Sequence, residues 1–124
     1  MINVEKTISN RILKKSLTLL NNKYKFEIIF YLGDKKMRFT EIKKNIGTIT
    51  QQLLTKLLRE MEKDKLIVRE KYNGLPRRVD YSLTNFGKST KIIVNCISRW
   101  EQKNLKTINK VMKKKIVDSI YDYY

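Results

Sequence analysis

The polar side chains that follow Thr50 are the residues of this sequence best suited to molecular recognition. A helix turns by about 100° per residue, so one side of a helix over 50–63 gathers amides, hydroxyls and cations without a carboxylate. That side carries Gln52, Thr55, Lys56, Arg59 and Lys63. Amide and guanidinium groups match the hydrogen-bonding groups on base edges in the major groove of DNA. The alternative is an ordinary solvated helix surface.

Residues suited to catalysis or to metal binding are scarce. The sequence has no histidine and one cysteine, Cys96, which excludes a Ser-His or Cys-His pair, an internal disulfide and an ordinary structural zinc site. We therefore expect no enzymatic activity, no metal and no cofactor. The first residues lack the basic and apolar blocks of a signal peptide, and no apolar run approaches the roughly 18 residues of a membrane-spanning helix. We expect a cytoplasmic protein.

The charge balance predicts a polyanionic partner. The 124 residues include 28 Lys and Arg against 12 Asp and Glu, so 28 − 12 gives a net charge of +16. Such an excess favours nucleic acid first and an anionic membrane surface second. However, 21 Lys, 10 Asn and 15 Ile also fit a codon bias toward A and T, which would leave part of the lysine excess as solvated surface. The length fits one domain, 1–124.

The stretch 50–63 is the clearest predicted helix. Thr50 is a good N-cap, and its hydroxyl could serve as the cap alone or also contact DNA. Ile49 and Leu54 occupy the positions of a hydrophobic staple. The side opposite the polar residues is apolar, with Leu53, Leu54, Leu57, Leu58 and Met61. A short helix over 40–46, ended by Gly47, precedes it, and a helix-turn-helix places its second helix in the major groove.

A β-hairpin is predicted after this helix. Residues 66–72 and 77–83 alternate between apolar and polar types, and an Asn-Gly pair with turn propensity separates them. Arg77 and Arg78 lie near its tip, where they could contact phosphates or the minor groove. Arg77 is the better candidate, because Arg78 could instead pair with Asp80.

Apolar periodicity predicts helices on both sides of this central part. A first helix covers 8–20, Thr84 caps a long helix that runs to about 103, and a last helix covers about 105–120. The apolar stripe of the long helix consists of Ile92, Ile93, Cys96, Ile97 and Trp100. Residues 23–32 are apolar almost all round, so buried helix and strand both stay open, although Gly33 suits the position after a helix.

Three residues each have more than one expected role. Cys96 is by default a small buried hydrophobe, with a redox sensor as the alternative. Trp100 fits packing in a dimer or in the core, or an aromatic platform for a ligand. Arg59 contacts DNA or forms an ion pair with Glu60 or Glu62.

From about residue 16 to 104, the sequence resembles the HxlR-type regulators, winged helix-turn-helix proteins related to MarR. The resemblance rests on Lys23-Tyr24, on residues 38–42 and 58–62, and most specifically on Pro76-x-Arg-Val-Asp-Tyr-Ser-Leu-Thr84 leading to Gly87. It implies a mainly α fold with a small β-hairpin wing (α+β). A DNA-binding core would cover about 22–83, and dimerisation helices about 8–20 and 84–120.

The resemblance also implies a homodimeric, sequence-specific repressor or activator that binds a pseudopalindromic operator. The residues expected to contact double-stranded DNA are Thr50, Gln51, Gln52, Thr55, Lys56, Arg59, Arg77 and Arg78. Those expected at the dimer interface are Ile92, Ile93, Cys96, Ile97 and Trp100. Several members of the family carry a redox-active cysteine where this sequence has Arg11, which argues against thiol sensing at that position. A small-molecule effector stays open, and charge alone would also fit a non-specific or architectural nucleic-acid-binding protein.

Overall fold

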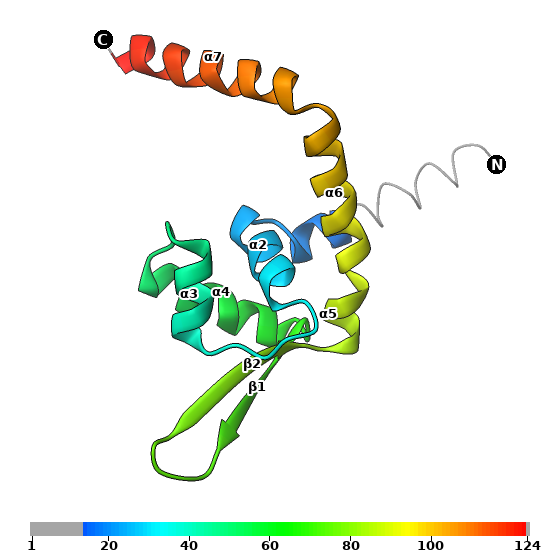
Figure 1. The fold of residues 1–124 in the computed structure, drawn as a ribbon, viewed down its shortest axis with the longest axis vertical. Helices are drawn as coiled ribbons and strands as arrows, with labels where there is room; N and C mark the ends of the chain where they lie inside the picture. Colours follow the sequence, from blue (N-terminus) through cyan, green and yellow to red (C-terminus); the bar gives the residue numbers. More distant parts are fainter. Residues whose placement is uncertain (1–13, 124) are drawn as a thin grey trace, which may run out of the picture. The chain divides into compact units, whose positions relative to one another are not determined.

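The computed structural model describes residues 14–123, with side chains as far as residue 118. Residues 14–19 are helical; the earlier part of the helix predicted over 8–20, with Arg11, lies outside the described residues. The named elements are α2 (Lys23–Leu32), α3 (Phe39–Ile46), α4 (Gln51–Lys63), β1 (Ile67–Tyr72), β2 (Arg78–Leu83), α5 (Asn85–Ser89), α6 (Lys91–Lys103) and α7 (Leu105–Tyr123) (Figure 1). One compact unit ends at Lys91, and the second begins at Ile92.

Residues 23–32 form a helix, α2, rather than a strand. The Asn22 side chain caps the helix by accepting a hydrogen bond from the Tyr24 N–H at 2.8 Å. Gly33 ends it with a φ of 50°, and its N–H donates to the Ile29 carbonyl. The helix packs Ile28 and Ile29 into the core at 0% exposure. The hydrogen bonds at both ends therefore favour a helix, whereas the apolar periodicity of this segment did not distinguish a helix from a strand.

The two helices expected before the hairpin are confirmed. Gly47 ends α3 at a φ of 81°, a conformation that glycine adopts at little cost. Thr50 caps α4, since its hydroxyl accepts the Leu53 N–H at 3.2 Å. Ile49 and Leu54 are both buried, as expected of a hydrophobic staple. The apolar side of α4 is buried through Leu54, Leu57, Leu58 and Met61, which leaves its polar side outward.

The expected hairpin is present as an antiparallel pair, β1 and β2, whose register runs from Ile67 opposite Leu83 to Tyr72 opposite Arg78. Its base is buried through Ile67 and Leu83, whereas residues 71–78 are all exposed. Figure 1 shows the hairpin projecting away from α2, α3 and α4. An isolated bridge between Met37 and Tyr81 attaches the chain before α3 to β2. The hairpin is thus fixed at one end and solvated at the other.

A close contact at Gly87 ties α5 to the base of the hairpin. A Cβ atom at Gly87 would lie 1.9 Å from the Leu66 carbonyl oxygen, so only glycine fits there. The Thr84 hydroxyl accepts the Gly87 N–H at 2.9 Å and lies within hydrogen-bond distance of the Leu66 carbonyl, at 3.2 Å. The Leu-Thr-x-x-Gly sequence therefore fastens the returning chain against the start of β1.

The prediction of one long helix from Thr84 to about 103 was wrong. Thr84 caps only the five-residue α5, and α6 begins after Thr90. Thr90 is buried, and its hydroxyl donates to the Gly87 carbonyl at 2.6 Å. Such local hydrogen bonds compete with continuation of a helix. The last helix is as expected but extends to Tyr123. None of the helices in the described part of the chain combines the length and the apolar character of a membrane span.

Candidate nucleic-acid interface

The outer side of α4 is accessible, as the sequence predicts. Gln51, Gln52, Lys56 and Arg59 are exposed, and Thr55 is half-buried. Two hydroxyls are partly committed within the helix: the Thr50 hydroxyl accepts the Leu53 N–H, and the Thr55 hydroxyl donates to the Gln51 carbonyl at 2.8 Å. The amide and cationic side chains on the outer side of α4 are therefore the groups that are free to bind a ligand.

Arg59 does not form the ion pair that the sequence left open. Within residues 14–118, the ion pairs join Lys25 to Glu60, Lys36 to Glu70, Arg78 to Asp80 and Lys91 to Asp34. Glu60, the carboxylate next to Arg59 in the chain, is thus turned toward α2. The Arg59 guanidinium faces solvent on the outer side of α4.

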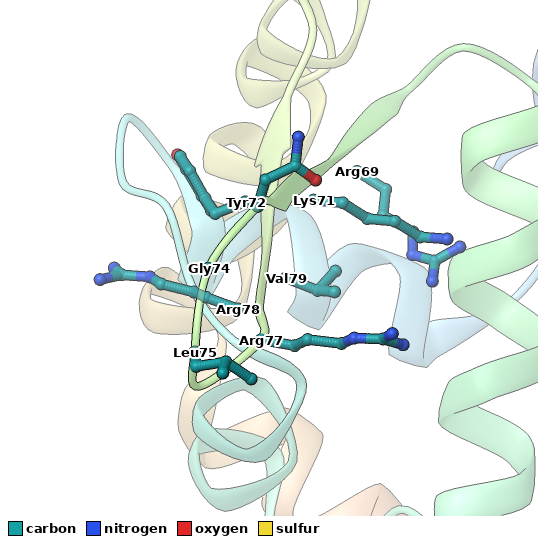
Figure 2. A pocket seen from close by; sticks show the side chains of 9 residues that line it. Arg69, Lys71, Tyr72, Gly74, Leu75, Arg77, Arg78 and Val79 are labelled. Atoms are coloured by element: carbon teal, nitrogen blue, oxygen red, sulfur yellow. The ribbon is translucent and has the colours of Figure 1, made fainter.

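The two faces of the hairpin differ in their charges. Strand alternation and register put Arg69 opposite Tyr81 and Lys71 opposite Val79 on one face. Figure 2 shows Arg69, Lys71 and Arg77 extending to the same side of the hairpin, while Arg78 extends to the other. We call the side with Arg69, Lys71 and Arg77 the open face. None of its three cations forms an ion pair within the described residues.

We call the opposite side, with Glu70, Tyr72, Arg78 and Asp80, the paired face. Arg78 Nε lies 3.0 Å from Asp80 Oδ1, and its guanidinium lies 5.7 Å from the centre of the Tyr72 ring. Glu70 Oε2 accepts hydrogen bonds from the Tyr72 hydroxyl at 2.7 Å and from Lys36 Nζ at 3.0 Å. The sequence left Arg78 between a DNA contact and an ion pair with Asp80, and the ion pair is present.

These contacts shift the protonation equilibria of the paired face. Hydrogen bonds from Tyr72 and Lys36 lower the pKa of Glu70. The hydrogen bond to Asp80 raises the pKa of Arg78, and the hydrogen bond to Glu70 raises the pKa of Tyr72. Each shift favours the state that keeps the paired contacts, so the face is neutralised internally.

The open face borders two hollows. The larger, of about 770 Å³, is lined along the hairpin by Arg69, Lys71 and Arg77 of the open face and also by Tyr72 and Arg78 of the paired face. The smaller, of about 180 Å³, is lined by Thr55 and Arg59 from α4, by Arg69 from β1, and by Phe39, Leu58, Glu62 and Tyr81. Since Arg59 and Arg69 line the same hollow, the outer side of α4 and the open face of the hairpin meet there, with the Glu62 carboxylate also in the lining.

Arg69 and Lys71 were not among the DNA-binding residues predicted from the sequence. Both lie in β1, two residues apart, and the signal that could have found them is strand alternation. In an antiparallel hairpin the positions facing Val79 and Tyr81 share their face, which is also the face of Arg77. Arg77 and Arg78 were predicted because both lie near the tip of the hairpin, but their side chains point to opposite sides.

The residues predicted at a dimer interface are exposed. Cys96 is exposed in the single chain, so its expected role as a small buried hydrophobe stays a prediction that depends on a partner covering α6. Trp100 is 61% exposed, which excludes core packing in the described chain. The reason is that α6 buries only Val94. Other exposed apolar residues of α6 and α7 include Ile92, Ile93, Ile97, Leu105, Val111, Met112, Ile116 and Val117.

Residues 19–109 match the family model described as HxlR-like helix-turn-helix. The HTH-type transcriptional regulator YdeP of Bacillus subtilis (strain 168) is 38% identical over 96 residues, which cover 77% of this chain and 75% of that protein.

Two solved structures are similar to most of the chain. A MarR-family transcriptional regulator from Porphyromonas gingivalis W83 matches with a TM-score of 0.72 and 29% identity, covering 74% of this chain and 90% of that one. The redox regulator HypR in its reduced form matches with a TM-score of 0.74 and 34% identity, covering 79% and 97%. These structures are winged helix-turn-helix proteins, and the chain shares their fold.

Proposed function

The chain belongs to the HxlR-like helix-turn-helix family of transcriptional regulators, and on that premise we propose that it recognises a specific double-stranded DNA sequence as a homodimer. Family membership implies DNA binding and assigns the chain to regulation of transcription rather than to catalysis. The proposal concerns how it binds, with which residues, and in which assembly. Its location would be the cytoplasm, where its DNA is found.

In this proposal α4 is the recognition helix and lies in the major groove. Gln51 and Gln52 occupy the first turn, which docks deepest, and read base edges through their amides. Lys56 and Arg59 follow one and two turns later and contact bases or phosphates. Thr50 and Thr55 contribute chiefly through the geometry of the helix start, since their hydroxyls are engaged within it.

The hairpin acts as a wing on the flanking backbone or minor groove. Arg77 is the principal contact, and Arg69 and Lys71 extend its basic surface toward α4. Arg78 contributes less, because a phosphate would have to compete with Asp80 for its guanidinium. Phosphate contacts of this kind provide affinity and orientation, whereas the base contacts of α4 provide discrimination.

Dimerisation would bury the exposed apolar side of α6 through Ile92, Ile93, Cys96, Ile97 and Trp100. Together with the N-terminal helix and the last helix, it would form the dimerisation part of a single functional domain, next to a DNA-binding core of about 22–83. Two copies of α4 would then enter successive major grooves about 34 Å apart on a pseudopalindromic operator.

The observation that carries the proposal is the exposed outer side of α4, with its amides and cations, which meets the open face of the hairpin at a hollow lined by Arg59, Glu62 and Arg69. An isolated basic helix would fit any polyanion. Amides at the first turn of a capped helix, beside a basic wing, are suited to a duplex.

The test begins with selection of preferred duplexes from a random pool about 40 base pairs long, enough for two half-sites one helical turn apart. Affinities for the selected duplex and for a shuffled version are then compared at physiological salt. We expect preference for the selected duplex by about a thousandfold or more, and a mass of two chains by light scattering. Equal affinity for both duplexes would favour the non-specific, architectural alternative.

A further inference from the structure

One lysine in this strongly basic chain is not at the surface. Lys25, in α2, is 2% exposed, and it is the only cation among the buried side chains of the described residues. Burial of an ammonium group is costly unless charged or polar partners replace its water. A lysine in this position therefore needs a structural explanation beyond the general charge excess.

The Lys25 ammonium is held by two side chains from other parts of the fold. Its Nζ lies 3.1 Å from Glu60 Oε2 in α4 and 3.2 Å from Asn21 Oδ1 in the turn before α2. The Lys25 side chain is 3% exposed, whereas that of Glu60 is 41% exposed. The contact thus joins a buried position of α2 to the flank of α4.

The other anchors of α4 differ in kind. Leu54, Leu57, Leu58 and Met61 bury its inner side in apolar contacts. Apolar burial is non-directional, so it holds a helix against the core without strictly fixing its rotation. The Lys25–Glu60 ion pair instead holds one particular carboxylate of α4 within 3.1 Å of a buried ammonium, and buried polar contacts have fixed a unique arrangement in other proteins.

The rotation of α4 about its axis matters because its inner side packs against the core and its outer side is proposed to contact DNA. Glu60 is adjacent to Arg59, so a carboxylate held toward α2 also fixes the direction of Arg59. The same rotation sets Lys56, one turn earlier, and the amides of the first turn. Loss of the polar anchor would let these side chains vary together relative to base edges.

We propose that the Lys25–Glu60 ion pair positions α4 for sequence discrimination. Lys25 is a positioning residue that contacts no DNA, and it fixes the rotation of the helix through Glu60. This inference rests on the proposed function, because it concerns the precision with which α4 reads DNA. It adds a determinant outside the outer side of α4 and outside the wing.

The informative variant is Lys25→Met, which fills a similar volume without the charge. We expect it to fold, since Glu60 is partly exposed and water can replace its lost partner. The readout is the ratio of dissociation constants for the shuffled and selected duplexes. We expect this ratio to fall about tenfold, the scale of one mismatched base pair. Circular dichroism and thermal unfolding check the fold.

Two matched variants separate positioning from charge. Lys23→Met removes an equal charge from an exposed position of α2 and should leave the ratio within about twofold of the original, as expected of a surface substitution. Glu60→Asp keeps every charge but shortens the side chain by one methylene, so a smaller fall in the ratio would come from geometry. Glu60→Asp also decides the outcome if Lys25→Met does not fold.

The results distinguish this inference from the proposed function. If the unaltered protein does not discriminate between the duplexes, the proposed function fails, and the inference fails with it. If the unaltered protein discriminates and both Lys25→Met and Glu60→Asp do so equally well, only the positioning role is overturned. An equal fall in Lys23→Met and Lys25→Met would also overturn it, since charge alone would then explain the effect.

Discussion

The two faces of the hairpin differ in the number of their basic side chains, three against one, and in their electrostatic environments. On the open face, Arg69, Lys71 and Arg77 lie along hollows that face solvent. On the paired face, Arg78 is bound to Asp80, and Glu70 is bound by Tyr72 and Lys36. Both faces belong to the same twelve residues of β-strand and the turn that joins them.

This difference shows why net charge does not locate a binding surface. A cation that already has a carboxylate partner gives up that contact when it binds a phosphate, whereas an unpaired cation gives up only water and counterions. Alternation along the strands, rather than the number of arginines, separates the two cases. The contrast between the faces can be tested by substitutions that remove equal charge from each.

The largest effect is expected from charge reversal on the open face. The variant Arg69→Glu/Arg77→Glu should lose affinity for the selected duplex by about a hundredfold or more at physiological salt, because two attractive contacts become repulsive. Fluorescence anisotropy measures this. The variant Arg78→Gln/Asp80→Asn removes the ion pair of the paired face without changing the net charge and should change affinity by about threefold or less. Comparable losses in both would remove the distinction between the faces.

Single neutral substitutions sharpen the comparison. Arg77→Gln should weaken binding about tenfold and lower the slope of log affinity against log salt by about one, as loss of one phosphate contact predicts. Arg78→Gln should leave that slope nearly unchanged. A salt titration of both variants measures this slope. If Arg78→Gln changed the slope as much as Arg77→Gln does, Arg78 would be a DNA contact as well.

Substitution of Asp80 tests whether the paired face contributes to the stability of the fold rather than to DNA binding. Asp80 is 3% exposed, and Asp80→Asn removes the charge that holds Arg78, so we expect a loss of about 1 kcal/mol in the free energy of unfolding. Urea denaturation followed by circular dichroism measures it. Glu62→Gln, at an exposed carboxylate of α4 without an ion pair in the described residues, should leave the midpoint unchanged. Destabilisation in both variants would point to general charge loss rather than to this pair.

The smallest effect is a dependence of stability on pH that only the paired face should show. The pKa of Glu70 lies below its ordinary value of 4.5, so its contribution is present above that value and is lost as the pH falls through the lowered pKa. Tyr72 and Lys36 have raised pKa values, so their contribution is lost only as the pH rises through those values.

A pH series of unfolding midpoints for the original protein and Glu70→Gln measures the contribution of the Glu70 carboxylate to stability. The difference between them should be present at pH 6 and should disappear in strong acid. For Arg77→Gln, on the open face, the difference should not vary across the acid range. A difference for Glu70→Gln that persists in strong acid would mean that the carboxylate acts through packing rather than through charge.

Local signals in the sequence predicted α4 and the hairpin well. Thr50 and its staple mark a helix start by short-range hydrogen bonding and packing, and the apolar stripe fixes which side is buried. The alternative role of Arg78 was also visible, because Asp80 lies two residues away on the same face of a strand. In these cases every interacting group lies within a few residues.

Other features are not marked by the pattern of apolar residues, or depend on partners far away in the chain. The choice of helix for α2 depends on its caps, and the break at Thr90 depends on a buried hydroxyl without a glycine or proline to mark it. Lys25 and Glu60 are 35 positions apart, so nothing in the local sequence distinguishes Lys25 from the exposed lysines around it. The exposure of Cys96 likewise depends on what covers α6, which periodicity alone does not specify.

The single indole of the chain, that of Trp100, provides a spectroscopic measure of whether another subunit covers α6. Trp100 is 61% exposed, one helical turn from the single thiol, Cys96. Its emission should resemble that of a hydrated fluorophore while α6 is uncovered and shift toward shorter wavelength when a second subunit packs there. Dilution of the unlabelled protein would then report self-association directly, and a maleimide dye would attach at one known point for distance measurements between subunits.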